Sequence, residues 1–497
     1  MKFTKITALL LVLCMMLSMV ACADGTDDAA TDDTNAKTAD VDAGDTEAET
    51  EDAAVLYGDL PTGDFGGYEF RMLNNTSNFA YTAMSAEELT GEPINDAIYM
   101  RNKNVEDTLK ITITENLVDW SVVNSTMNNS ILANEDAYDV FWNESHFVAP
   151  FAIKQQLASI GDVTGLNLTK PWWNAQAMDS FTVADRLFFL VGDLHLMFNE
   201  SFWMVGFNKN ILDSYQLKDP YQLVRDGAWT LDAMFEDMSA VATDLDGDGK
   251  IDGSDQFGVT CYNGALFPLL LASGETIFQK DADDIPSYVI PGDRFFSVFE
   301  KIATYFFAPA VNDIVCMDGR TPNISQYPDT WHGVFSSGHA LFYLEPIGSL
   351  KKLREMEAEF GIVPYPKYDE KQENYVSYVA HYAAVLGVPI TNSDLARTGV
   401  ILENLSAESH KELKDTYMKT TLNFKYIRDV ESAEMLNIIF STGTFELSRV
   451  FGLNAINDAL SNSANNGGEN LASLLSKSEK SANKSLEKTL AGLLGLE

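Results

Sequence analysis

Basic residues are scarce in this chain of 497 residues: 34 Lys and Arg stand against 73 Asp and Glu, which gives a formal net charge of −39. A negative excess of this size repels the phosphates of nucleic acids, so we expect no DNA or RNA partner. The charge does not identify a ligand, because an acidic excess is usually a solvated surface.

Long hydrophobic runs are missing outside the N-terminus, so we expect no membrane-spanning segment after processing. The chain begins "MKFTKITALLLVLCMMLSMVAC", where two lysines precede an apolar run and Ala21 stands beside Cys22, an order typical of an export signal. This stretch resembles a bacterial lipoprotein signal. The resemblance implies cleavage before Cys22, acylation of its sulfur, for example with palmitate, and attachment to the outer face of the cell membrane. The alternative is an ordinary signal peptide with an unused cysteine.

Cysteine is rare, and outside the N-terminal signal only Cys261 and Cys316 remain. These two either form a disulfide, as exported proteins allow, or stay as buried free thiols. Residues 24–52 contain no aromatic residue and many acidic ones. Such a segment cannot offset the entropy of ordering, so we expect 23–57 to be a disordered acidic tether.

Familiar catalytic motifs are absent from the sequence: it contains no HExxH, GxSxG or P-loop, and its six His residues are scattered. A chain of this length with 46% hydrophobic residues is too long to fold around a single hydrophobic core, so we expect two or more structural units. Strand-like runs alternate with helical patterns, such as 231–241 after Thr230 and 431–440, which predicts α/β layers. The strand-like runs are 68–73, 109–114, 138–142, 186–192, 256–260, 339–344 and 360–366.

The stretch "DLDGDGKIDGSD", residues 244–255, has the spacing of a calcium-binding loop. Ca²⁺ takes about six to eight oxygen ligands around a sharp turn, and Gly249 at position six allows that turn. The chain has no second loop of this kind, and position twelve is Asp, so we predict a structural calcium site. The alternatives are a metal-free acidic turn or a weak magnesium site. The expected ligands are Asp244, Asp246, Asp248, the carbonyl of Lys250, Asp252 and Asp255.

Three collinear blocks resemble the family 1 extracellular solute-binding proteins of ABC importers. In the first, 205–249, Asn208–Lys209 ends a strand, Pro220 follows, and Trp229–Thr230 caps the next helix. The others are "FPLLLASGE" (267–275) and "FSSGHALFYLEPIGSLKKLREMEAEFGIVPYPKY" (335–368). With "KYIRDVESAEMLNII" near the end, the resemblance covers most of 58–460.

The resemblance implies a two-lobed α/β fold of the periplasmic-binding-protein type, with hinge crossovers and a central ligand cleft. The lobes would comprise 58–200 with 336–390 and 201–335 with 391–460, followed by a helical tail, 461–497. It also implies a monomer whose lobes close on a small solute and which then docks on a membrane permease. An oligosaccharide is the expected ligand; peptides, polyols, polyamines and anionic sugars are alternatives.

A sugar cleft needs aromatic planes together with carboxylates or amides at strand ends. Trp142 matches a strand-end tryptophan of the family that lines the cleft, although one residue is missing after Asp139, which could turn the side chain to the other face. Core packing is the alternative role for each candidate. The candidates are Trp142, Asn143, Glu144, Trp203, Tyr262, Asn263, Phe267, Trp331 and Glu345.

Two other functions are compatible with these residues. A surface glycoside hydrolase would use a carboxylate pair such as Glu144 and Glu345. A calcium-dependent adhesion or scaffold protein would bind its partners through the loop 244–255. We favour a binding protein that is not an enzyme, because the chain lacks the catalytic motifs and the two carboxylates serve equally well as hydrogen-bond acceptors.

Overall fold

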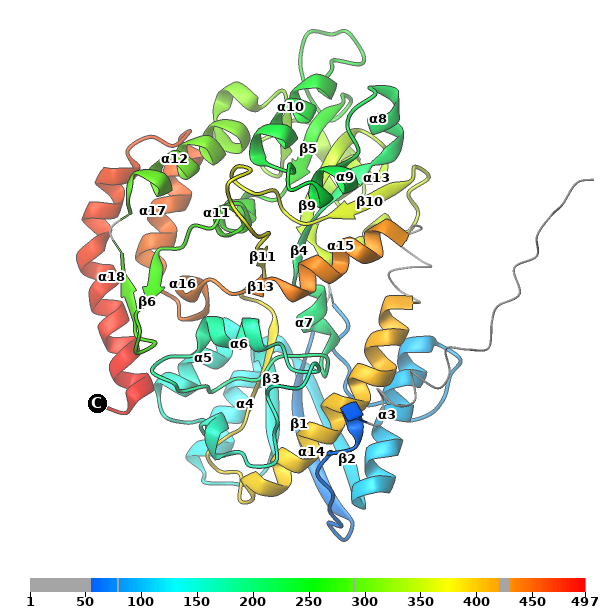
Figure 1. Cartoon of the computed structure of the whole chain (residues 1–497), viewed down its shortest axis with the longest axis vertical. Helices are drawn as coiled ribbons and strands as arrows, with labels where there is room; N and C mark the ends of the chain where they lie inside the picture. Colours follow the sequence, from blue (N-terminus) through cyan, green and yellow to red (C-terminus); the bar gives the residue numbers. More distant parts are fainter. Residues whose placement is uncertain (1–54, 78–79, 290, 420–429, 497) are drawn as a thin grey trace, which may run out of the picture. The chain divides into compact units, whose positions relative to one another are not determined.

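The computed structural model describes residues 55–77, 80–289, 291–419 and 430–496, so Cys22 and nearly all of the predicted tether lie outside the described residues. Residues Leu56–Glu497 form one compact unit. Two β-sheets with helices on their faces build this unit (Figure 1). The predicted α/β layers are therefore confirmed.

The first sheet has four strands in the order β12-β3-β1-β2. β1 (Tyr68–Thr76) pairs in parallel with β2 (Ile111–Asp119) and β3 (Val140–Glu144), whereas β12 (Ala384–Gly387) runs antiparallel to β3. Helices pack on both β1 and β3. The central strands of such a covered sheet are buried on both faces, which explains the apolar runs in their sequences.

The second sheet has five strands in the order β10-β4-β9-β5-β8. β4 (Trp203–Asn208) runs antiparallel to β10 (Phe360–Val363) and β9 (Ala340–Pro346), and β5 (Phe257–Cys261) runs parallel to β9 and β8 (Val315–Met317). The start of β4 therefore lies beside the ends of β9 and β5. This register brings together the side chains that follow those strand ends.

Helices surround the two sheets. Figure 1 shows the first sheet with α3 to α6 and α14 in its lower half, and the second sheet with α8, α9, α10 and α13 above. The helices are α3 (Pro93–Leu109), α4 (Trp120–Leu132), α5 (Ser145–Ile153), α6 (Ala175–Phe181), α7 (Leu196–Glu200), α8 (Lys209–Ser214), α9 (Pro220–Arg225), α10 (Leu231–Val241), α11 (Leu266–Ala272), α12 (Asp293–Ile302), α13 (Trp331–Ser336), α14 (Leu395–Glu408), α15 (Val430–Ser441), α16 (Leu447–Val450), α17 (Asn454–Asn465) and α18 (Leu471–Leu494). Shorter turns are η1 (Ile160–Asp162), η2 (Asn263–Ala265), η3 (Ala303–Phe307), η4 (Pro309–Val311), η5 (Ile324–Gln326), η6 (Ile347–Leu353) and η7 (Ser409–Lys414). Two short strand pairs complete the unit: β6 (Phe278–Lys280) with β7 (Pro286–Tyr288), and β11 (Ser377–Tyr378) with β13 (Gly443–Thr444).

Three segments that connect the two sheets, 201–203, 377–380 and 442–444, run side by side, and we call them the hinge segments. The Val379 N–H donates to the Thr444 carbonyl over 2.9 Å, and the Ala380 N–H donates to the Ser201 carbonyl over 3.0 Å. Gly443 is packed so closely that a Cβ there would lie 2.3 Å from a ring carbon of Phe202. Backbone hydrogen bonds thus join the three hinge segments where the chain passes between the two sheets.

The predicted lobe boundaries need a correction. The sequence assigned 336–390 to the first lobe, but β9 and β10 pair with β4 in the second sheet, and the chain returns to the first sheet only at β12. Helix α14, assigned to the second lobe, packs on α3 beside the first sheet. A strand buried on both faces, such as β9, carries no pattern that says which sheet it joins.

Most local predictions are confirmed. The strand-like runs correspond to β1, β2, β3, β5, β9 and β10, except that 186–192 forms only isolated bridges. The Thr230 hydroxyl accepts a hydrogen bond from the Ala233 N–H over 3.3 Å at the start of α10. The tail is helical in α17 and α18. Among the described residues, no helix combines the length and hydropathy that a membrane crossing requires.

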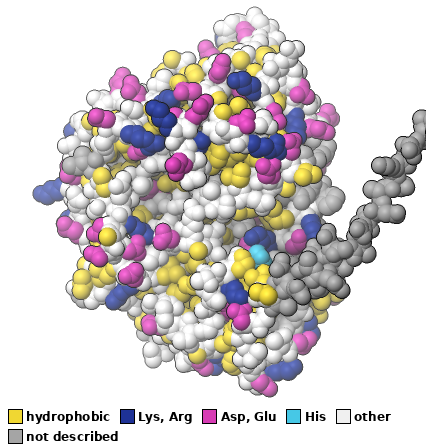
Figure 2. Space-filling model, viewed as in Figure 1, with side chains coloured by type: hydrophobic (Ala, Val, Ile, Leu, Met, Phe, Trp, Pro, Cys, Tyr) yellow, Lys and Arg dark blue, Asp and Glu magenta, His cyan; other side chains and the backbone are white. Residues whose placement is uncertain are grey.

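The surface charge is mixed in sign. Figure 2 shows acidic and basic side chains interspersed over the face in view. Cys261 and Cys316, on the neighbouring strands β5 and β8, are buried free thiols, and burial raises the pKa of both. The open choice between a disulfide and free thiols is thereby settled in favour of free thiols.

Candidate ligand cleft

A cleft of about 570 Å³ is lined by residues of both sheets, at the ends of their strands. This volume lies within the range of small-molecule sites, about 300–1,000 Å³. The residues that line it are Trp120, Glu144, His146, Phe147, Trp203, Tyr262, Trp331, His332, Glu345, Pro346, Ser349, Lys352, His381 and Tyr382.

One wall comes from the residues that follow β2 and β3. Trp120 begins α4, Phe147 lies in the first turn of α5, and their rings stack with centroids 5.4 Å apart and planes 21° apart. Trp120 is 44% exposed, so one face of this ring pair is open. Glu144 ends β3 beside the stack, and its Oε2 lies 3.6 Å from Nδ1 of His146.

The opposite wall comes from the second sheet. Tyr262 follows β5, and its ring stacks on Trp331 at the start of α13, with centroids 5.9 Å apart and planes 28° apart. The indole N–H of Trp331 donates to Oε1 of Glu345 over 2.8 Å, and the Ser349 hydroxyl donates to Oε2 over 3.2 Å. Each wall therefore combines an aromatic stack with a carboxylate.

The hinge side of the cleft carries Trp203, His381 and Tyr382. The guanidinium of Arg449 lies 3.2 Å from Nε2 of His381. Burial, together with Arg449, lowers the pKa of His381 to about 2, so the ring stays neutral and accepts from the guanidinium. This contact fixes one imidazole at the point where the hinge segments meet the cleft.

Burial also shifts the acids of the two walls. It raises the pKa of Glu144 to about 7, and it raises the pKa of Glu345 to about 7 against the opposing effect of the hydrogen bonds from Trp331 and Ser349. Burial lowers the pKa of His332 to about 3, with Lys352 adding to the effect. Near neutral pH these two acids are therefore about half protonated, so each can either donate a hydrogen bond to a ligand hydroxyl group or accept one from it.

The structure brings together much of the predicted ligand site. Glu144, Trp203, Tyr262, Trp331 and Glu345 all line the cleft. They come from both sheets and from positions between 144 and 345 in the sequence. Glu144, Tyr262 and Glu345 lie at or just beyond strand ends, as predicted, whereas Trp203 and Trp331 were predicted because they precede expected hinge crossings; Trp203 begins β4 and Trp331 begins α13.

Trp142 and Asn143 do not line the cleft, contrary to the prediction. Trp142 lies two residues before the end of β3, where it is 2% exposed and its ring packs 5.9 Å from that of His195. The Asn143 amide is buried, and it donates to the Trp120 carbonyl and to Asn124. Both side chains are too deep in the sheet to meet a ligand, so core packing is their role.

Asn263 and Phe267 also lie away from the cleft lining. Asn263 begins the short turn η2 after Tyr262 and is exposed. Phe267, in α11, is 7% exposed, and the guanidinium of Arg449 lies 4.6 Å from its ring centre. The turn carries the chain away from the strand end within one residue of Tyr262, which explains why only Tyr262 reaches the cleft.

Several lining residues were not predicted from the sequence. The predicted strand 109–114 stops short of the real end of β2 at Asp119, so Trp120 was not recognised as a strand-end residue. Phe147 lies two residues after the recognised segment ending at Ser145 and could have been found by extending that segment through the first turn of a helix. His381 and Tyr382 directly follow the hinge segment 377–380, which carries no recognisable pattern.

The predicted calcium loop has a partly assembled set of ligands. Carboxylate oxygens of Asp244, Asp246 and Asp255 lie within 4.8 Å of one another. Asp255 is buried, and its oxygens accept from the N–H groups of Leu245 and Asp252. The predicted ligands Asp248, Lys250 and Asp252 are not part of this group; an oxygen of Asp252 accepts instead from Asn323 over 2.5 Å. The donor set is of the all-oxygen kind that Ca²⁺ prefers.

No protein-family model matches the chain, and no curated protein matches it. Solved structures do match. An ABC substrate-binding protein from Listeria monocytogenes in complex with cycloalternan is 14% identical, with 85% of this chain and 99% of that chain covered and a TM-score of 0.53. The maltose/maltodextrin-binding domain MalE from Bdellovibrio bacteriovorus, bound to maltotriose, is 14% identical over 84% of this chain and 100% of that chain, with a TM-score of 0.51. The apo form of RafE from Streptococcus pneumoniae is 12% identical over 86% and 100%, with a TM-score of 0.55.

The matches extend over nearly the full length of each solved chain and over 84–86% of this chain. At this level of identity they establish the architecture and not the ligand. The chain has the two-lobed α/β fold of periplasmic binding proteins, as the sequence predicted.

Proposed function

We propose that this chain is the substrate-binding component of an ABC importer and that it captures a carbohydrate in the cleft between its two sheets. The observation that carries the proposal is the convergence of two aromatic stacks and two carboxylates, from strand ends of opposite sheets, on one cleft of about 570 Å³. A ligand in this cleft can contact an aromatic ring and a carboxylate on each of the two walls.

The chemistry of the lining favours a sugar. A pyranose has apolar C–H faces, which stack on aromatic rings, and hydroxyl edges, which bond to carboxylates. Trp120 and Tyr262, both 44% exposed, present open ring surfaces on opposite walls. Two solved structures of this fold are bound to cycloalternan and to maltotriose, which supports an oligosaccharide as the class of ligand.

Capture then works by closure of the lobes. A sugar bound between Trp120 on one wall and Trp331 on the other stabilises the conformation in which the walls are near each other, so ligand shifts the population toward the closed form. The hinge segments absorb the rotation. The closed form is the species that docks on a membrane permease.

The proposal includes an anchor and a metal. Acylation at Cys22 would hold the exported protein, as a monomer, at the outer face of the cell membrane. Calcium, bound by Asp244, Asp246 and Asp255, would fasten the loop between α10 and β5 and so stabilise the second lobe without touching the ligand. Mass spectrometry of membrane-extracted protein, looking for a diacylglyceryl-modified N-terminal peptide that begins at Cys22, tests the anchor.

The test of carbohydrate capture is a thermal-shift screen of the purified protein across monosaccharides and oligosaccharides, followed by calorimetry on each ligand that raises the melting temperature. We expect an oligosaccharide to bind with one site per chain, and scattering to report a more compact particle on binding. Failure of all sugars to bind, with binding of a peptide or polyamine instead, would overturn the carbohydrate assignment. Release of reducing ends from a bound glycan would instead indicate a hydrolase.

A further inference from the structure

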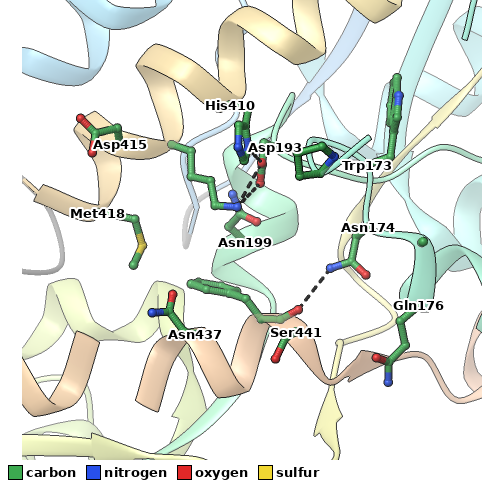
Figure 3. Close-up of a pocket in the computed structure, with 14 residues that line it drawn as sticks. Trp173, Asn174, Gln176, Asp193, Asn199, His410, Asp415, Met418, Asn437 and Ser441 are labelled. Carbon is green, nitrogen blue, oxygen red and sulfur yellow. Dashed lines mark hydrogen bonds and ion pairs between the residues drawn. The ribbon is translucent and has the colours of Figure 1, made fainter. Parts of the chain in front are cut away.

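A second cavity, of about 650 Å³, lies outside the ligand cleft and shares no lining residue with it. It is bordered by the segment before α6, by α7, by η7 and by α15. Figure 3 shows its side chains, with Trp173 and Asn174 to the right and Asn199 near the centre, beside Asp193 and below His410. Its volume is again that of a small-molecule site.

Asn199 is the most informative residue of this cavity. It is 5% exposed and lies in the cavity wall beside Asp193, as Figure 3 shows. Within the described part of the chain, its side-chain amide forms no hydrogen bond. Its amide atoms are open to the cavity, so a ligand or water there can form hydrogen bonds with them.

The charged groups of the cavity are locked in place. Asp193 is buried, and its carboxylate lies 2.5 Å from Nδ1 of His410 and 3.1 Å from Nζ of Lys414. Because Lys414 is held by Asp193, it is not free to bind an anion, and Asp415 at the rim adds a further negative charge. Lys414 likewise opposes a cation. The cavity therefore favours a neutral ligand.

The indole of Trp173, in the cavity wall, is held in place by a hydrogen bond. The indole N–H of Trp173 donates to Oε2 of Glu403 over 2.9 Å, and that of the neighbouring Trp172 donates to Oε1 over 3.2 Å. Asn174 is fixed too, since its amide donates to the Phe440 carbonyl over 3.3 Å and its oxygen accepts from the Ala177 N–H. A preorganised ring next to an amide that is open to the cavity is a combination that binds polar ligands with apolar faces.

We propose that this second cavity is a binding site for a neutral polyhydroxyl molecule of about monosaccharide size, with Asn199 bonding its hydroxyl groups and Trp173 packing on its apolar face. The proposal does not depend on the function of the ligand cleft. It assigns a small-molecule site on a face of the protein that neither the cleft nor the calcium loop uses.

The test uses the whole chain labelled with 5-fluorotryptophan, so that the signals of the seven Trp residues report separately by fluorine NMR. The probes are D-glucose, myo-inositol and N-acetyl-D-glucosamine. We expect at least one of them to shift the Trp173 signal in a saturable way. The substitution Asn199→Leu, which keeps the volume but removes the amide, should weaken this response about tenfold. Asn199→Ala serves as the second variant if Asn199→Leu does not fold.

The matched control is Trp331→Ala in the ligand cleft, which should leave the Trp173 response unchanged. Three outcomes overturn the proposal: no shift with any probe at tens of millimolar, an unchanged response in a folded Asn199 variant, or loss of the response in the Trp331 variant. Maltotriose, monitored through the signals of Trp120, Trp203 and Trp331, tests the cleft in the same sample. A response at Trp173 without one at the cleft would separate the two proposals.

Discussion

The indole of Trp331 and the carboxylate of Glu345 form a 2.8 Å hydrogen bond that joins the start of α13 to the end of β9. The bond holds the Trp331 ring against Tyr262, so the aromatic surface of the second wall has one orientation before any ligand arrives. A preorganised surface loses less side-chain entropy on binding.

Removing either ring of this wall should weaken sugar binding. We expect Trp331→Ala and Tyr262→Ala each to cost about 1–3 kcal/mol of binding free energy, through lost stacking and burial. Calorimetry with the oligosaccharide that gives the largest thermal shift measures the effect. Tyr215→Ala removes an exposed tyrosine outside the cleft and should leave the affinity unchanged. Equal losses in all three variants would contradict the assignment of the wall.

The acid of this wall should make stability depend on pH. Burial raises the pKa of Glu345 to about 7, whereas an unfolded Glu titrates near 4.5. Below about 4.5 both states hold the proton; as pH rises to about 7 the unfolded state releases it first. The contribution of this residue to the free energy of unfolding is therefore lost across that window, by on the order of 3 kcal/mol.

Urea unfolding between pH 4.5 and 7.5 measures this loss. In Glu345→Gln, which does not titrate, the decline with pH should be smaller than in the parent protein by a similar amount. Glu144, whose pKa burial also raises to about 7, remains in the variant and leaves part of the decline in place. Identical pH profiles for the parent protein and the variant would contradict the burial of a titrating Glu345.

Much of the architecture was predictable because buried strands and capped helices leave local signals. The run 257–260 and the cap at Thr230 identify β5 and α10 from neighbours in the sequence alone. The pairing of β9 with β4 had no such signal, since a strand with two apolar faces fits either sheet. Strand pairing depends on contacts between residues far apart in the sequence, which local sequence patterns do not reveal.

The candidate site shows the same division. Glu345 and Tyr262 were predictable because strand ends of an α/β sheet form its ligand edge. Trp142 was assigned wrongly because β3 continues for two residues beyond it. Its ring is therefore packed against His195 and does not stand at the strand end. His381 reaches the cleft only through the crossing of the hinge segments, which brings residues more than 200 positions apart together, as the contact of His146 with the His381 carbonyl illustrates.

The hinge should be sensitive to a single methyl group. In Gly443→Ala the new Cβ would lie 2.3 Å from a ring carbon of Phe202, so the segments 201–203 and 442–444 must separate. We expect a lower melting temperature and a change in the compaction that ligand produces in scattering. Gly161→Ala, where the nearest atom would be 3.8 Å away, is the matched control. Unchanged melting in both variants would argue against a tightly packed crossing.

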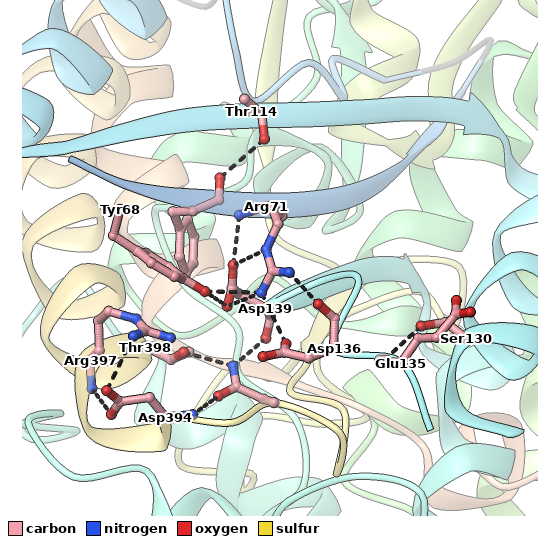
Figure 4. Close-up of polar contacts among 12 residues, drawn as sticks. Tyr68, Arg71, Thr114, Ser130, Glu135, Asp136, Asp139, Asp394, Arg397 and Thr398 are labelled. Atoms are coloured by element: carbon pink, nitrogen blue, oxygen red, sulfur yellow. Dashed lines mark hydrogen bonds and ion pairs between the residues drawn. The ribbon is translucent and has the colours of Figure 1, made fainter. Parts of the chain in front are cut away.

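A buried carboxylate stabilises the first sheet (Figure 4). Asp139 is fully buried; it accepts from the Tyr68 hydroxyl over 2.7 Å and from both the backbone and the guanidinium of Arg71. Asp139→Asn keeps the shape but removes the charge opposite Arg71, and we expect it to cost about 3 kcal/mol of unfolding free energy in urea. Asp107→Asn breaks an exposed pair with Lys103 and should cost less than about 1 kcal/mol. Equal costs would show that the network contributes no more than a surface pair.

Calcium should stabilise the fold without being needed for ligand binding. If Asp244, Asp246 and Asp255 hold the ion, free calcium at about 100 times the dissociation constant adds roughly 2.7 kcal/mol to the free energy of unfolding. We therefore expect EDTA to lower the melting temperature and calcium to restore it, with magnesium restoring less. The melting temperature of Asp244→Asn should be near that of the EDTA-treated parent protein and should no longer rise with calcium, whereas that of Asp232→Asn, outside the loop, should rise as in the parent protein.

Calorimetry below the melting temperature should give the same sugar affinity with and without EDTA, because no residue of the loop lines the cleft. If EDTA lowers the sugar affinity while the protein stays folded, calcium takes part in ligand binding. If neither EDTA nor calcium changes the melting temperature, the loop is a metal-free acidic turn.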